Sequence, residues 1–182
     1  MKSHLPHNAL ALALWFPLTV TGQDPAFPER DRKVKVTYDK SKGISIVHFG
    51  PMHLAGPEFR VGELRLTGYF TYPEQTFVKP ESITMVFRSV AEPQNGWEMS
   101  KRKDLEITAD GTHWRVSEVG VVDTRSNVTA VVDTLAVSIP LEVFSKIASG
   151  KKVRVRLGDR SFDLDKQHLQ ALQSLANRAD PK

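Results

Sequence analysis

The chain has 182 residues, with 25 Lys and Arg against 21 Asp and Glu, and it contains no cysteine. The net charge of +4 is far below the concentrated basic surface of a nucleic-acid-binding protein, so no nucleic acid partner is expected. The lack of cysteine excludes thiol catalysis, thiolate metal sites and disulfides, and it favours a bacterial envelope protein over a disulfide-bonded animal or plant one.

Residues 1–22 have the organisation of a secretory signal peptide. Lys2 precedes the apolar run Ala9–Val20, and small residues follow it up to Gly22. The run of twelve residues is too short to span about 30 Å of hydrocarbon, although a retained membrane anchor is the alternative. We therefore expect an exported protein, periplasmic or extracellular, with no transmembrane segment after cleavage. Lys2 is the only Lys, Arg, Asp or Glu among the residues removed by cleavage, so the net charge falls from +4 to +3.

The remaining 160 residues divide into a short lead-in and one domain. Residues 23–33 contain prolines and charged side chains with little to bury, which predicts a flexible lead-in. Residues 34–182 are enough to form a single β-sandwich-like domain with its own core.

Apolar and polar residues alternate along the first half of this domain, which predicts β-strands. A hairpin is expected from strands at 34–38 and 44–49 joined by a turn at 41–43, and a loop starts at Gly50. The next strand covers 61–72, with Leu64, Leu66 and Phe70 pointing inward. Gly62 and Gly68 suggest a bulge or bend in it. Residues 82–90 follow as a central, mostly apolar strand.

The second half combines strands with two helices. Asp110-Gly111 predicts a type I′ turn between strands at 105–108 and 114–116. Residues 119–122 are expected to continue the second of these strands, before a turn at 123–127. The further expected elements are a strand at 130–139, a helix at 141–149, strands at 151–157 and 161–164, and a last helix capped by Asp165.

These elements predict an all-β fold, an antiparallel sandwich or open barrel of about nine short strands with two short helices in the C-terminal half. A β-rich α+β arrangement is the alternative. The helices would close one end of the sandwich or cover one sheet face. A parallel α/β sheet is disfavoured because helices do not alternate with strands.

Histidines are the first candidates for metal binding or acid-base chemistry. His48 and His53 flank a Gly-Pro pair, but their spacing matches no established ligand motif, so they are weak candidates for a metal site. His168 lies on the apolar stripe of the last helix and is expected to be a partly buried structural residue. The chain has no Gly-x-Ser-x-Gly or Ser-x-x-Lys motif, so no catalytic residue and no cofactor is assigned.

Two surface features suggest binding. Arg154 and Arg156 alternate with Val153, Val155 and Leu157, so one face of that strand is predicted to be cationic. Trp97 follows Asn95-Gly96 in a polar loop, where an exposed aromatic ring can stack on a ligand. The simpler interpretation of the arginines is a solvated sheet face.

The sequence therefore predicts an exported, non-enzymatic binding or interaction domain that is monomeric or weakly associating. Its partner is expected to be an envelope protein or an anionic polymer, with Arg154, Arg156 and Trp97 as contacts. One alternative is a secreted hydrolase or metal-binding protein that uses His48 and His53. Another is a structural component of an envelope assembly.

Overall fold

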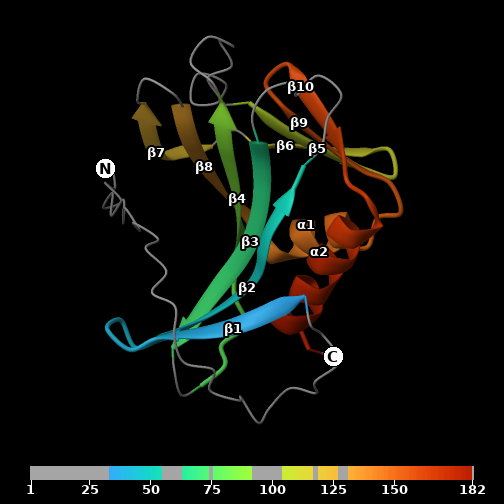
Figure 1. Ribbon diagram of the computed structural model, residues 1–182. Coiled ribbons are helices and arrows are strands. Elements are labelled where there is room, and N and C mark those ends of the chain that lie inside the picture. Colours follow the sequence, from blue (N-terminus) through green and yellow to red (C-terminus); the bar gives the residue numbers. More distant parts are fainter. Residues whose placement is uncertain are drawn as a thin grey trace, which may run out of the picture.

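The computed structural model describes residues 33–54, 63–73, 76–91, 104–116, 119–126 and 131–181. These residues form ten strands in two antiparallel sheets, together with two helices late in the chain (Figure 1). This is the strand-rich, sandwich-like fold that the sequence predicts, with one strand more than expected.

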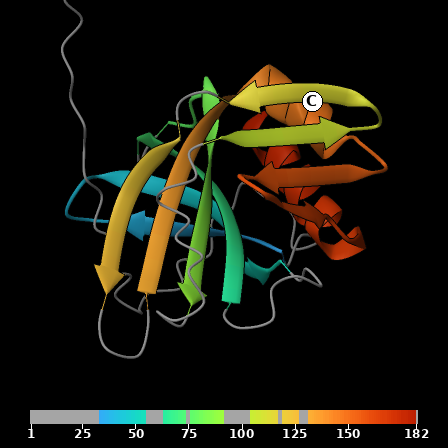
Figure 2. The same cartoon turned by 90° about the horizontal axis from the view of Figure 1, so that it is seen from above.

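The six-stranded sheet, called the large sheet below, has the order β1-β2-β3-β4-β8-β7. Its strands are β1 (Val34–Asp39), β2 (Ile44–His53), β3 (Glu63–Pro73), β4 (Ser82–Ala91), β7 (Gly120–Ser126) and β8 (Val131–Pro140). The four-stranded small sheet has the order β10-β9-β5-β6 and consists of β5 (Leu105–Ala109), β6 (Thr112–Val116), β9 (Val153–Leu157) and β10 (Arg160–Asp163). Strands β4, β7 and β8 run across the direction of the small sheet's strands (Figure 2).

The two helices complete the core on the inner face of the large sheet. Helix α1 (Leu141–Ala148) contacts β4, β5 and β8, and helix α2 (Lys166–Ala179) contacts β1, β2, β3 and α1. Each helix buries one apolar side, such as Phe144 of α1 and Leu172 of α2. The helices thus cover one sheet face, which is one of the two arrangements that the sequence leaves open.

Side-chain alternation gives each sheet an inner and an outer face. Leu64, Leu66 and Phe70 of β3 are buried, which confirms their predicted inward orientation. Strand β4 pairs with β3 on one side and β8 on the other, so the prediction of a central strand is also confirmed. Residues between these buried positions point to the outer face of the large sheet.

Two turns have the backbone conformation that their sequences favour. Gly43 has φ of +62° in the β1–β2 hairpin, where the backbone N–H of Lys42 donates to the carbonyl oxygen of Asp39. Asp110 and Gly111 both have positive φ, at +47° and +87°, which confirms the predicted type I′ turn between β5 and β6.

Strand β2 is longer than the sequence predicts. It continues through Gly50-Pro51 to His53, and its register against β3 shifts between Phe49 and Met52. A bulge tolerates Pro51, which has no backbone N–H to donate to a ladder, so the Gly-Pro pair does not end the strand. The extra residue lies on β2, and the shift begins at the pair that Phe49 forms with Gly68, so the irregularity is next to one of the two glycines that suggested it. Gly62 lies outside the described residues.

The segment after β6 also differs from the prediction. Residues 120–126 do not continue β6 in the small sheet; they form β7, which pairs with β8 at the edge of the large sheet. The expected turn over 123–127 falls mostly within this strand, because Asp123–Ser126 pair with β8. The polar residues of an edge strand face solvent, and their composition therefore resembles that of a turn.

Gly68 is required by close packing inside the large sheet. A Cβ atom at this position would lie 2.8 Å from Cζ of Phe49, closer still to its Cε1, and 3.1 Å from Cδ2 of Leu175 in α2. The missing side chain therefore lets the Phe49 ring lie between β3 and α2.

Replacing Gly68 with Ala should lower the free energy of unfolding by about 1–3 kcal/mol, because the added methyl group overpacks a filled site. Gly50→Ala is the matched control, since a Cβ at Gly50 meets nothing within 4 Å. Urea unfolding of both variants checks this. Equal stability of the two variants would show that the packing around Gly68 is not tight.

Candidate binding surfaces

Arg154 and Arg156 lie on the outer face of the small sheet, because the residues alternating with them in β9 are buried. Arg154 forms a two-pronged ion pair with Asp163, with Nε 2.7 Å from Oδ1 and Nη2 3.0 Å from Oδ2. This contact holds the pKa of Asp163 below its ordinary value. The predicted orientation of both arginines agrees with the structure.

Arg156 has carboxylate partners on the neighbouring strand. Its Nη2 lies 2.6 Å from Oε1 of Glu106 and its Nε lies 3.1 Å from Oε2. The hydrogen bond from Arg156 is the main cause of the lowered pKa of Glu106. Asp104 lies 3.9 Å from Nη1 of Arg156, and Arg115 approaches Glu106 to 3.7 Å. The arginines of this face are thus accompanied by carboxylates within the same sheet.

Charge compensation makes the small sheet a less favourable surface for an anionic partner than its arginines alone suggest. An incoming anion would have to compete with Asp163 and Glu106 for the same guanidinium donors. Trp97, the third predicted contact, lies outside the described residues. A binding role for these three residues stays a prediction.

The outer face of the large sheet carries basic residues in direct cross-strand register. Arg65 of β3 lies opposite Arg88 of β4, and His53 of β2 lies opposite Arg65 on its other side. Arg65 forms an ion pair with Glu63 of its own strand. Arg88 is exposed and makes no hydrogen bond or ion pair with another residue in the described part of the chain.

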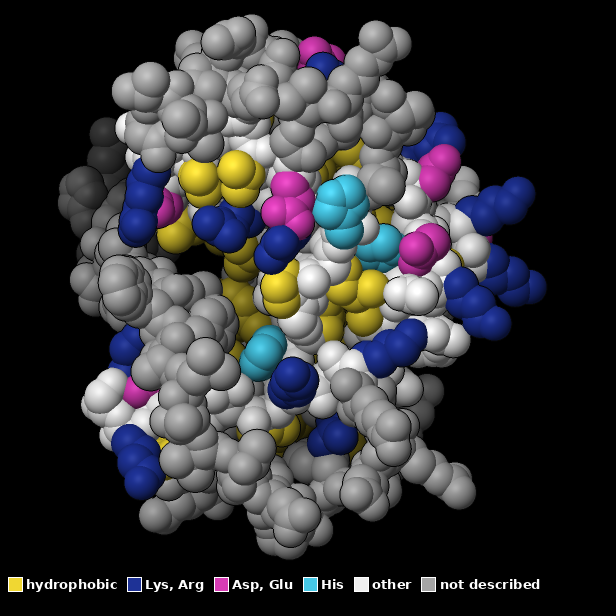
Figure 3. All heavy atoms as spheres, in the orientation of Figure 1, with side chains coloured by type: hydrophobic (Ala, Val, Ile, Leu, Met, Phe, Trp, Pro, Cys, Tyr) yellow, Lys and Arg dark blue, Asp and Glu magenta, His cyan; other side chains and the backbone are white. Residues whose placement is uncertain are grey.

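Half-buried apolar side chains flank Arg88 on both sides along β4, whereas Glu63 and Thr67 flank Arg65 on β3. Val86 lies opposite Ala136 in one neighbouring row of the sheet, and Val90 lies opposite Val132 in the other. In the space-filling view, hydrophobic side chains lie beside Lys, Arg and His side chains over β2 and β3 (Figure 3). We call Arg65, Arg88 and these four apolar residues the arginine platform.

His48 and His53 share the outer face of β2 but lie apart. They pair with Tyr69 and Arg65 of β3, four residues from each other, which corresponds to about 13 Å along the strand. This separation does not favour one metal ion bound by both rings. His48 Nε2 lies 3.2 Å from Oγ1 of Thr37, and burial lowers the pKa of His48. No group of three or more metal-binding side chains occurs among the described residues.

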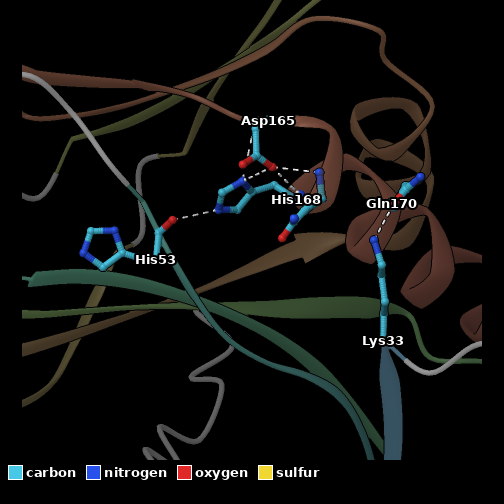
Figure 4. Close-up of polar contacts among 6 residues, drawn as sticks. Lys33, His53, Asp165, His168 and Gln170 are labelled. Atoms are coloured by element: carbon cyan, nitrogen blue, oxygen red, sulfur yellow. Dashed lines mark hydrogen bonds and ion pairs between the residues drawn. The ribbon is translucent and has the colours of Figure 1, made fainter.

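His168 joins the start of α2 to the end of β2 (Figure 4). Its Nδ1 lies 2.7 Å from Oδ1 of Asp165, and its Nε2 donates to the carbonyl oxygen of His53 at 3.1 Å. Oδ1 of Asp165 also accepts from the backbone N–H groups of Gln167 and His168, which confirms the predicted helix cap. The buried, structural role expected for His168 is confirmed as well.

Sequence reasoning missed the Arg65–Arg88 pair and the contact of His168 with His53. Both depend on which distant strands and helices meet, and no local pattern encodes that register. The only local signal was the alternation in residues 61–72 and 82–90. It places each arginine on the outer face but does not predict which residue lies opposite it on the next strand.

Comparison with known proteins gives no functional information. No model of a known protein family matches the sequence, and no curated protein or solved structure matches it significantly.

Replacing Asp165 with Ala should lower the free energy of unfolding by about 1 kcal/mol near neutral pH, because α2 loses its cap. Hydrogen bonds hold the pKa of Asp165 below its ordinary value, and the hydrogen bond from the backbone N–H of His168 contributes most. Its stabilisation is therefore present above the unfolded-state pKa of about 3.9, and it is lost as the pH falls through the folded-state pKa. Urea unfolding of both proteins should show a smaller difference in acid than at neutral pH.

The control for this measurement is Gln167→Ala, which changes an exposed residue of the same turn without removing an ionisable group. Its effect on stability should not change over the same pH range. A constant difference for Asp165→Ala would contradict the role assigned to the carboxylate.

The double variant Arg154→Glu, Arg156→Glu should retain the fold but unfold a few degrees lower, because it places like charges beside Asp163 and Glu106. Val155→Glu, on the buried side of the same strand, should prevent folding. Thermal unfolding followed by circular dichroism compares the two. Loss of cooperative unfolding in the arginine variant would mean that the faces of β9 are reversed.

Proposed function

We propose that this protein is an exported, non-enzymatic binding domain that engages an anionic partner through the arginine platform. The signal-like pattern of residues 1–22 supports export to the periplasm or the outside. Those residues lie outside the described part of the chain. Neither described helix has the length and apolar character needed to cross a membrane.

The observation that carries the proposal is the direct opposition of Arg65 and Arg88. Like charges at opposite positions destabilise an antiparallel pair, so this arrangement has a cost in the free protein. An anionic partner removes that cost by placing negative charge over the pair. Arginine is also the charged residue most enriched at protein interfaces, where its long side chain packs and forms several hydrogen bonds.

The alternative of a hydrolase or metal-binding protein has less support. His48 and His53 are separated along β2, and the described residues contain no group of three or more side chains that could hold a metal ion. The face that contains them also carries the opposed Arg65 and Arg88, whose charge suits contact with an anionic partner.

A structural role in an envelope assembly is a second candidate, and one observation favours it. Strand β7 is an edge of the large sheet, and Val121 and Val122 on it are 42% and 41% exposed. An edge strand with exposed apolar side chains can accept a strand from another chain. The register shift between Val121 and Asp123 works against this, because a bulge disrupts the edge.

Capture from an envelope extract tests the proposal. The protein is purified after expression of the full chain, and it is compared with the Arg65→Glu, Arg88→Glu and the Arg154→Glu, Arg156→Glu double variants. A partner retained by the wild type and by the second variant, but lost by the first, supports binding through the arginine platform. The two variants carry the same charge change, so net charge cannot explain a difference between them.

If the partner binds the Arg65→Glu, Arg88→Glu variant but not the Arg154→Glu, Arg156→Glu variant, the small sheet is the binding surface instead. A partner lost only after Val121→Lys would favour strand addition at β7. If the wild type captures nothing, the proposed binding function is wrong.

A further inference from the structure

We propose that the ligand of the arginine platform is an acidic peptide segment in extended conformation, whose carboxylate is bound by Arg88. This inference rests on the proposed binding function and adds the chemistry and shape of the partner. Three features of the platform support it: the ion pairing of the two arginines, the apolar residues beside Arg88, and the spacing of Val86, Arg88 and Val90 along β4.

Arg88 is the arginine of the pair that remains available. Glu63 already contacts Arg65, whereas Arg88 has no carboxylate partner among the residues that the structure describes. A guanidinium group stays charged at all physiological pH values and presents a planar set of donors that matches both oxygens of one carboxylate. A carboxylate over Arg88 also reduces the repulsion between Arg88 and Arg65.

The apolar flanks of Arg88 favour a peptide over a polysaccharide, a polyphosphate or a lipid headgroup layer. Val86 and Val90 stand two residues before and after Arg88 on the same face of β4, and Ala136 and Val132 of β8 lie opposite them. Hydrophilic polyanions would leave these half-buried groups without apolar contact. A peptide that carries apolar side chains next to its acid satisfies both kinds of group.

The spacing of these residues predicts the pattern of the peptide. Successive outward residues of a strand are about 6.6 Å apart, so Val86, Arg88 and Val90 form an apolar–cationic–apolar series with a period of two residues. An extended segment has the same period. The complementary sequence therefore places an Asp or Glu between apolar residues at the positions two before and two after it.

The test is to select peptides that bind this protein from a displayed library of random short sequences. The protein is purified after expression of the full chain. Enriched sequences should contain an acid with apolar residues two positions away on both sides. Arg88→Gln should weaken their binding about tenfold or more, the loss expected for a charge-assisted hydrogen bond. Arg88→Lys keeps the charge but not the two-pronged geometry, so it should restore only part of the affinity.

Two controls separate binding from folding and from general charge effects. Lys146→Gln removes one positive charge from α1, where Lys146 pairs with Glu142, and should leave peptide binding unchanged. Arg88→Gln should unfold at the same temperature as the wild type or slightly higher, because it removes the opposed like charge. A purely structural role for Arg88 would instead lower the unfolding temperature.

Several results overturn the inference. Enriched peptides without acids, or binding unaffected by Arg88→Gln, would show that the platform does not recognise a carboxylate. If no peptide is enriched, but polyphosphate or phosphatidylglycerol vesicles bind in an Arg88-dependent manner, the partner is a polymer or a membrane. The proposed function would then stand without the peptide. If these probes and the envelope extract all fail to bind, the proposed function falls as well.

Discussion

The packing of Phe49, Gly68 and Leu175 is the constraint on which the surface of this protein depends. Gly68 leaves room for the Phe49 ring between β3 and α2, and no other residue type fits there without displacement. This contact fixes which residues of β2 and β3 face the core. Since side chains alternate in a strand, a slip of one residue would turn Arg65 inward and Leu64 outward. The core thus determines the cross-strand neighbours on the opposite, exposed face.

The two outer faces produced in this way differ in how their charges are satisfied. On the small sheet, Arg154 and Arg156 lie beside carboxylates of β10 and β5, and these ion pairs hold the pKa values of Asp163 and Glu106 low. On the large sheet, Arg65 forms an ion pair with Glu63 of its own strand. Arg88 lies opposite Arg65 on β4. The first arrangement satisfies charge within the protein. The second leaves a cation and apolar neighbours available to a partner, which is the basis of the proposed function.

Local patterns in the sequence were sufficient for most of the elements and for the inner face of β3. The buried Leu64, the Asp110-Gly111 turn and the cap at Asp165 each follow from residues within a few positions of one another. The prediction failed where an element's residues resemble those of another class, as in β7, whose Asp123–Ser126 segment has the composition of a turn. It also missed every contact that depends on register between distant segments. Arg156 was placed on the correct face, but its partner Glu106 belongs to another hairpin, and the opposition of Arg65 and Arg88 is visible only once β3 and β4 are paired.

The central claim is that the arginine platform, rather than the outer face of the small sheet, contacts the partner. The most direct measurement is arginine-specific modification with phenylglyoxal, read by mass spectrometry at each arginine, with and without envelope extract. Arg88 and Arg115 are both exposed in the free protein and provide the comparison between the two faces. If the arginine platform contacts the partner, the extract slows modification of Arg88 and leaves that of Arg115 unchanged. Slower modification of Arg115 with no change at Arg88 would contradict it.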